Sequence, residues 1–294
     1  MIKFPRIFLS AGLAALCIAT TASAQSRRKN PTSKLYVADQ VGDSQIDTGT
    51  EIDDLTKRSV YNAEGTTLET KANSNASIVL SNGTGIYFDV ATRVKIQTFQ
   101  QESFRPNRSD IEDEPSVSTT HLMVDHGVIG VSTSKLVAGS RMEYDTPLAS
   151  ATIHGRQAVI QSLDNMTVIS MYQGEATVQA GPLDRPHEVK NRQQIIIKPG
   201  KTGEPNIVII QDIPEGADED RFKWVEERVL TADAARKLVY FEVQARKGSD
   251  GDITLFDDGG TAPTGGTNEI VAVPVVPAAT TVQPNVSPAN LTSG

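Results

Sequence analysis

The chain has 294 residues, a formal net charge of −8 and one cysteine, Cys17. An acidic chain without a basic patch is a poor nucleic-acid binder, because Lys and Arg side chains that neutralise phosphates supply most of that affinity. Cys17 lies in an N-terminal apolar run, so the rest of the chain can form no disulfide, thiol nucleophile or cysteine-based metal site. Its stability must come from an ordinary hydrophobic core.

The first 24 residues have the pattern of a cleavable signal peptide. Lys3 and Arg6 give a positive start, residues 7–18 are mainly apolar, and residues 22–24 read Ala-Ser-Ala, a small-x-small cleavage site. The alternative is an uncleaved membrane anchor, but the apolar run is short for a bilayer. We expect cleavage after Ala24, a periplasmic or secreted bacterial protein, and no integral membrane span after cleavage.

Composition divides the remaining chain into four parts. Residues 25–43 are polar and indicate a flexible leader. Residues 44–201 carry most of the alternating apolar pattern and indicate a β domain, and residues 202–247 indicate a helical appendix. Residues 248–294 are rich in Pro, Thr and Gly without a sustained period, which is typical of a disordered tail.

Alternation of apolar and polar residues predicts a mainly β fold. Residues 76–88 place β-branched and aromatic runs on either side of Asn82-Gly83, a dipeptide that tolerates the positive φ angles of a tight hairpin turn. A half-buried strand follows and ends near Phe99. Further short strands are predicted at residues 121–124, 127–131, 140–144, 151–154, 158–161, 167–172, 175–179 and 193–198. Such spacing is typical of a sandwich, a barrel or a short β-solenoid, and adjacent strands could pair locally in all three.

An acidic segment interrupts the strand pattern between residues 100 and 120. Asp110, Glu112, Asp113 and Glu114 lie close together there, and such an oxygen-rich cluster could hold a calcium ion. The order of ligands and the central glycine of an EF-hand are missing, however. We therefore interpret the segment as a solvated excursion between strands.

A helical period appears near the end of the β pattern. Phe222, Val225 and Val229 fall on one face of a predicted helix over residues 218–230, which Asp218 could cap. A second helical stretch is predicted to begin near Thr231, with Leu238 and Phe241 as its buried residues. Trp224, the only tryptophan, could mark a partner surface, but packing against the β domain is the commoner role.

The middle of the chain resembles the FecR domain over roughly residues 43–201. Three segments carry the likeness. They contain Gly65, Leu68, Thr70, Ser74, Ala76, Ile78, Leu80 and Asn82-Gly83-Thr84 in the first; Gly127-Val128-Ile129-Gly130-Val131 and Lys135-Leu136 in the second; and Tyr144, Thr146-Pro147, Ala149, Ala151, Ile153, Gly155, Val168, Ser170, Gly174, Ala176, Val178 and residues 193–200 in the third. The resemblance implies a compact FecR-like β-sandwich or short β-solenoid, here with a C-terminal helical appendix.

FecR domains form the extracytoplasmic part of bacterial regulators that relay iron-transport signals to sigma factors. Two departures limit what the resemblance implies. The family usually has Thr and an acidic residue after the glycine at position 155, where this chain has Arg156-Gln157. The regulators also carry a helical sigma-binding domain before their membrane span, whereas only a few residues precede the apolar run here. We therefore take the resemblance as support for the fold and the compartment, with a link to envelope signalling left open.

The sequence contains no recognised catalytic pattern. G-x-S-x-G, H-E-x-x-H, P-loop and Rossmann glycine motifs are absent from the chain after Ala24. A zinc site from His121 and His126 would need His154 or a carboxylate to converge on them, and their spacing fits no metal motif. We expect no enzyme activity, no cofactor and no metal.

Binding to an unidentified envelope protein is the leading functional hypothesis. The β domain would present its edges and loops, with strand addition at an edge as the natural mode. The candidate partner-binding residues are Thr146, Pro147, His154, Gly155 and Arg156. The alternative is a glycan- or cell-wall-binding module, which would need an exposed aromatic platform that a chain with 5% aromatic residues can hardly assemble.

Overall fold

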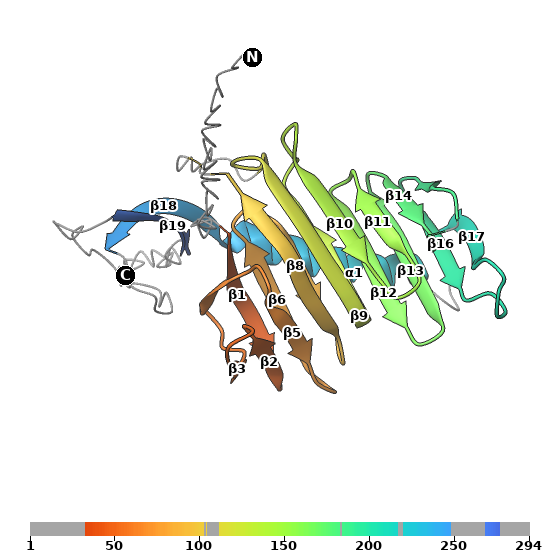
Figure 1. The fold of residues 1–294 in the computed structure, drawn as a ribbon, viewed down its shortest axis with the longest axis horizontal. Helices are drawn as coiled ribbons and strands as arrows, with labels where there is room; N and C mark the ends of the chain where they lie inside the picture. The colour runs from red at the N-terminus through yellow and green to blue at the C-terminus, as the bar shows by residue number, and fades with distance from the viewer. Residues whose placement is uncertain are drawn as a thin grey trace, which may run out of the picture.

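The computed structural model describes residues 33–102, 104, 112–182, 184–216, 220–247 and 268–276. It is mainly β, with one helix in the described residues (Figure 1). The strands that precede the helix form two layers, sheet A and sheet B, which share one long strand, β9 (Ser118–Ser132). After the helix, β18 (Tyr240–Lys247) and β19 (Asn268–Val275) form a separate two-stranded sheet. None of the described helical residues forms a segment apolar and long enough to cross a bilayer.

Sheet A is antiparallel throughout. Its strands are, in spatial order, β4 (Val60–Asn62), β1 (Lys34–Val41), β6 (Asn75–Leu80), β7 (Gly85–Phe88), the second half of β9, β12 (Gln157–Leu163), β13 (Met166–Gln173), β16 (Gln193–Lys198) and β17 (Ile207–Asp212).

Sheet B has the same plan with one exception, a parallel pair between β9 and β10. Its strands are, in spatial order, β3 (Ile52–Asp54), β2 (Ser44–Asp47), β5 (Thr67–Thr70), β8 (Arg93–Gln101), the first half of β9, β10 (Arg141–Asp145), β11 (Ser150–Ile153), β14 (Ala176–Gln179) and β15 (His187–Val189).

Strand β9 passes from one sheet to the other at a glycine. Its first half pairs with β8 and β10, and its second half pairs with β7 and β12. The change falls at Gly127, whose φ of 96° only glycine adopts without strain. The sequence predicts a turn over residues 125–127 between two separate strands. That prediction is wrong, because the same local signal bends a continuous strand between two layers.

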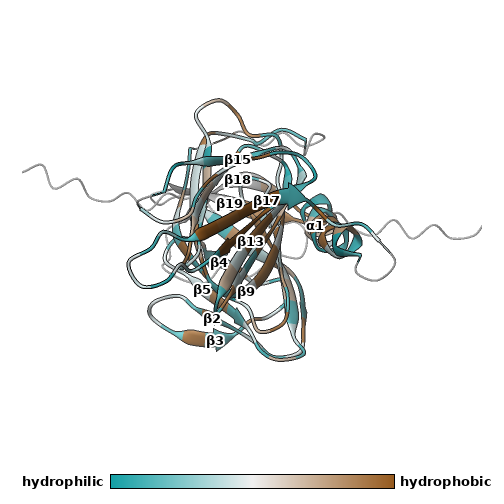
Figure 2. Ribbon diagram, turned by 90° about the vertical axis from the view of Figure 1, so that its right-hand side faces the viewer, coloured by the Kyte–Doolittle hydropathy of each residue, from teal (hydrophilic) through white to brown (hydrophobic). Residues whose placement is uncertain are grey.

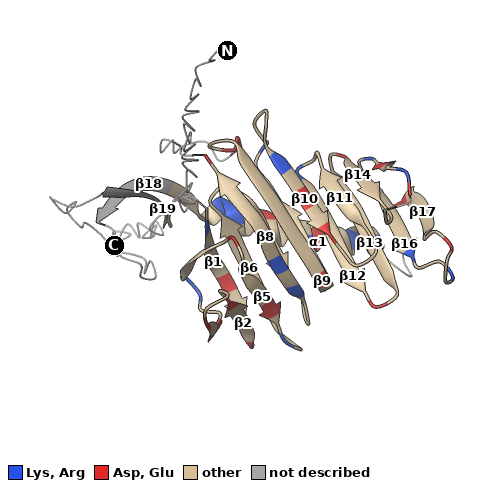
Figure 3. Cartoon of the chain, in the orientation of Figure 1, with Lys and Arg blue, Asp and Glu red and all other residues tan. Residues whose placement is uncertain are grey.

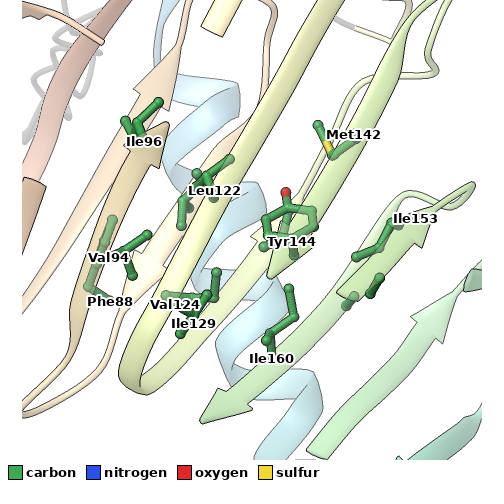
Figure 4. Packing of buried hydrophobic residues seen from close by; sticks show 14 of the residues in the cluster. Phe88, Val94, Ile96, Leu122, Val124, Ile129, Met142, Tyr144, Ile153 and Ile160 are labelled. Atoms are coloured by element: carbon green, nitrogen blue, oxygen red, sulfur yellow. The ribbon is translucent and has the colours of Figure 1, made fainter. Parts of the chain in front are cut away.

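The two sheets enclose one hydrophobic core, which identifies the architecture as a sandwich rather than a barrel or a solenoid. Alternate residues of each strand point into it, as the predicted alternation requires. Figure 4 shows Phe88, Ile129 and Ile160 of sheet A meeting Val94, Leu122 and Tyr144 of sheet B, and all of these side chains are fully buried.

Helix α1 (Arg221–Leu238) covers the outer face of sheet A, so the centre of that sheet is buried on both faces (Figure 2). Val225 and Val229 pack on Val159 of β12, and Ala235 belongs to a cluster with Val79 of β6. Buried outward residues such as Val79 and Val159 explain the nearly continuous apolar runs in the central strands.

The glycines of β7 and β9 allow the helix to lie close to the sheet. A Cβ atom added to Gly85 would lie 2.2 Å from the carbonyl oxygen of Ala232, and one added to Gly130 would lie 2.6 Å from that of Arg228. Side chains at these two positions would therefore hold the helix away from the strands. The guanidinium of Arg228 also bonds the carboxylate of Asp89, with its Nε 2.8 Å from Oδ2.

The helix itself differs from the prediction in two ways. It is one continuous element rather than two, because Thr231 and its neighbours continue the turn instead of starting a new one. Its N-cap is Asp220, whose carboxylate accepts a hydrogen bond from the backbone N–H of Lys223 at 2.9 Å, while Asp218 lies outside the described residues. Leu238 is exposed, and Phe241 lies in strand β18 (Tyr240–Lys247).

The segment boundaries differ from the predicted ones in three places. Strand β1 occupies residues assigned to the flexible leader, and β17 and β18 lie in the segment assigned to a helical appendix. Strand β19 (Asn268–Val275) pairs with β18 inside the segment assigned to a disordered tail. The predicted signal peptide, residues 25–32 of the leader, and residues 248–267 and 277–294 of the tail lie outside the described residues.

Candidate binding cleft

The five candidate residues fall into two groups at opposite ends of β11. Thr146 and Pro147 precede that strand, and residues 154–156 follow it. Thr146 is buried; its Oγ1 accepts a hydrogen bond from the N–H of Ala149 at 3.0 Å and also accepts one from Thr167 Oγ1 at 3.0 Å. This side chain closes the turn that contains Pro147 and is unavailable to a partner.

The second group marks a place where the chain crosses twice between the sheets. Gly155 joins β11 of sheet B to β12 of sheet A, and Gly174 joins β13 of sheet A to β14 of sheet B. A Cβ atom on Gly174 would lie 2.2 Å from the Cα of Gly155, so the two backbones touch. The absence of a side chain at Gly155 is what allows the second crossing to approach so closely.

Beside this crossing lies an open cleft of about 250 Å³. Its lining residues are Ser134, Lys135, Leu136, Ser140, His154, Gly155 and Arg156. Three of the five candidate residues thus meet in one place. Lys135 and Leu136 belong to the second FecR-like segment, and nothing in that segment predicts a binding site.

Two cationic side chains, Lys135 and Arg156, line the cleft, and the acidic residues 112–114 lie beside them. Lys135 and His154 are exposed, and Arg156 donates from Nη2 to Glu112 at 2.5 Å. The pKa of Glu112 is lowered, chiefly by this hydrogen bond and the charge of Arg156, with further contributions from Arg236 and Lys237. Arg156 is therefore already paired with a carboxylate, and an acidic group of a partner would have to share or replace Glu112 on it.

A buried carboxylate supports the wall of the cleft. Glu114 accepts hydrogen bonds from Ser118 Oγ and Ser140 Oγ, both at 2.5 Å, and from the N–H of Val137 at 3.2 Å. Burial raises the pKa of Glu114 even though these hydrogen bonds oppose the shift. The expectation of a solvated excursion is wrong at this residue, because Glu114 is only 4% exposed.

The residues considered for metal sites do not converge. Within the ranges that the structure describes, no three His, Cys, Asp or Glu side chains gather as ligands, and Asp110 lies outside those ranges. His121 contacts Asp145 across sheet B, with 2.7 Å between Nε2 and Oδ2. His154 lies in the cleft instead.

The outer face of sheet B also carries charges of both signs. Arg93 bonds to Glu69 at 2.6 Å and lies 3.4 Å from Asp125, and Arg141 pairs with Glu143. Figure 3 shows both signs interspersed on this face. Its charges are largely neutralised by their neighbours.

The side chain of Trp224 packs against the protein instead of pointing into solvent. Its indole lies between the guanidinium groups of Arg221 and Arg228, which sit 3.9 and 3.7 Å from the ring, and it borders the apolar cluster beneath α1. Trp224 is only partly exposed. The packing interpretation of this residue is confirmed.

No family model and no curated protein matches the chain. Among solved structures it is similar to two crystal structures of a protein described as a "putative anti-sigma factor" from Parabacteroides distasonis, at 12% identity and a TM-score of 0.37 for each. Each match covers 54% of this chain and 62% of the other, so the chain spans less than two thirds of that protein's length. A likeness at this level gives no ground for transferring a function.

Proposed function

We propose that this protein is an exported, FecR-like module of the bacterial cell envelope that binds a protein partner and catalyses no reaction. The cleft between Lys135 and Arg156 would receive an acidic segment of that partner. Its two cationic side chains are the observation that carries the proposal, because Arg156 already binds one carboxylate, that of Glu112, and carboxylates of a partner would compete for Arg156 and pair with Lys135. A role in envelope signalling would follow if the partner is a regulator or transporter.

The expected affinity from charge alone is modest. A surface ion pair contributes about 0.2–1 kcal/mol, so pairs with Lys135 and Arg156 together change affinity by about twofold to thirtyfold. Apolar contact with Leu136 and the shape of the cleft would supply the remainder. The binding should therefore weaken with added salt.

The glycan alternative has less support. Every Phe, Tyr and Trp side chain in the described ranges is buried or half-buried. These residues therefore offer no aromatic platform for a sugar ring.

A titration with a defined acidic peptide tests the cleft. The chain from Gln25 onward would be titrated with a fluorescent peptide of alternating Glu and Ser. The double variant Lys135→Gln/Arg156→Gln should bind about tenfold more weakly than the wild type. The matched control Lys190→Gln/Lys201→Gln, at exposed positions outside the cleft, makes the same change in net charge and should bind as the wild type does. Equal affinities for the two double variants would reject the cleft as the binding site.

A further inference from the structure

Strand β17 forms an open edge of sheet A. It pairs with β16 on one side, and the described residues place no strand on its other side. The N–H of Ile213 donates to the carbonyl of Arg192 at 2.9 Å, in register with the β16–β17 ladder. Hydrogen-bonded pairs alternate along an antiparallel ladder. The backbone N–H and C=O groups of Ile207, Ile209 and Gln211 therefore point toward β16. The backbone groups of Val208 and Ile210 therefore point to the open edge.

The side chains along this edge are apolar and accessible. Ile207 is 54% exposed, and Ile209 and Ile210 are each 41% exposed. On the outer face of sheet A, Ile209 lies opposite Ile196 of β16, and Ile196 lies opposite Val168 of β13. These three residues form an apolar row that reaches the open edge. No charged residue interrupts the strand before Asp212.

The other edges of sheets A and B in the described chain are protected. β4 and β15 have three residues each, and β3 carries Asp53 and Asp54 in its three residues. Short strands and charges of this kind are common means of preventing edge-to-edge pairing. β17 is longer than these edges and lacks such protection, which makes it a site for strand addition.

We propose that β17 pairs antiparallel with β17 of a second copy of this chain, joining the two A sheets across a two-fold axis. The strand is a good complement to itself, because pairing two copies matches two apolar edges of equal length and, in the register given below, opposes no like charges. This self-association is separate from the binding cleft and does not depend on the proposed function.

A pairing centred on Ile209 allows the backbone groups on the open edge to form hydrogen bonds and brings no like charges together. Ile209 lies opposite its own copy, and Val208 lies opposite Ile210 of the other copy. The Val208 and Ile210 pairs use the backbone groups that face the open edge, and each exchanges two hydrogen bonds. Asp212 lies opposite the neutral Asn206, so no like charges oppose each other. Figure 2 shows that the end of the molecule carrying β17 is not covered by α1.

Sedimentation of the chain from Gln25 onward tests this proposal. We expect a concentration-dependent dimer. Ile209→Lys places two like charges directly opposite each other and should raise the dissociation constant at least about tenfold. The matched control Ile52→Lys changes an exposed isoleucine on the edge strand β3 and should leave the dimer intact. A monomer at several hundred micromolar, growth into larger oligomers, or equal behaviour of the two variants would overturn the proposal.

A cysteine variant tests the register. The chain from Gln25 onward has no cysteine of its own. Residue 209 and its copy would form a non-hydrogen-bonded pair with Cα atoms about 4.5 Å apart, which is within disulfide range. Mild oxidation of Ile209→Cys should therefore give a disulfide-linked dimer, whereas Gln211→Cys, opposite Ile207, should not. Failure of Ile209→Cys to cross-link in a protein that still dimerises would refute this register.

Discussion

Replacing Gly85 by alanine should loosen helix α1 from sheet A. The added Cβ atom would lie 2.2 Å from the carbonyl oxygen of Ala232, whereas ordinary contacts begin near 3.4 Å. The obstacle is backbone, so no side-chain rotation relieves it. The helix must move outward by roughly 1 Å, and overpacking of this kind costs about 1–3 kcal/mol.

Complete release of the helix would cost more. Val225 and Val229 are fully buried beneath it, and exposing both would cost about 3–6 kcal/mol at about 1.5–3 kcal/mol for each side chain. The helix should therefore shift and stay attached. Alanine in a strand regains about 0.5–1 kcal/mol relative to glycine, so the midpoints of the two ranges give an expected net loss of about 1.3 kcal/mol.

Urea unfolding followed by circular dichroism and by the fluorescence of Trp224 measures this loss. Trp224 is the only tryptophan and lies on α1, so its emission reports on the position of the helix. Gly216→Ala is the matched control, because a Cβ atom at that position meets nothing within 4 Å. A Gly85→Ala protein as stable as the Gly216→Ala protein would refute the explanation of close packing through glycine.

Three further changes have defined expected outcomes. Tyr144→Phe should raise the free energy of unfolding by about 1–3 kcal/mol, because the buried Tyr144 hydroxyl has no hydrogen-bond partner in the described structure; a loss of stability in urea unfolding would contradict this. Glu114→Gln tests pH dependence: the raised pKa of the buried carboxyl makes the folded wild type retain a proton above pH 4.5, so its stability falls as pH rises through that raised pKa. The difference in unfolding free energy between this variant and the wild type should increase over the same range in a pH series, and a constant difference would count against the assigned cause. Gly155→Ala places a Cβ atom 2.6 Å from the carbonyl of Gln173 and should cost about 1–3 kcal/mol, while an unchanged midpoint of thermal unfolding would show that the crossing tolerates a side chain.

Local signals predicted the parts of the fold that local chemistry determines. Asn82-Gly83 does form the turn between β6 and β7, and Gly83 has a φ of 86°. The residues near 127 were misinterpreted because a glycine with positive φ serves equally well in a turn and in a strand that bends between sheets. Only the distant partners of β9 distinguish the two. The sequence does not predict strand β1 for a similar reason. This strand forms by pairing with β6, which is distant from it in the sequence.

The candidate site was predicted in part. His154, Gly155 and Arg156 are adjacent in sequence and necessarily remain together. Thr146 and Pro147 were grouped with them by a shared motif, but an intervening strand separates the two groups. Lys135 comes from the end of another strand, and only the folded arrangement of the sheets brings it to the cleft. No periodicity in the sequence carries that information.

Photo-crosslinking in living bacterial cells most directly tests the central claim that the cleft holds an envelope protein. A photoreactive amino acid would replace Leu136 in the full chain, and the adducts would be recovered from the periplasmic and membrane fractions. We predict an adduct to one envelope protein, lost in the Lys135→Gln/Arg156→Gln background and retained in the Lys190→Gln/Lys201→Gln background. Adducts only to cytoplasmic proteins, or an adduct that persists when both cleft cations are removed, would contradict the account.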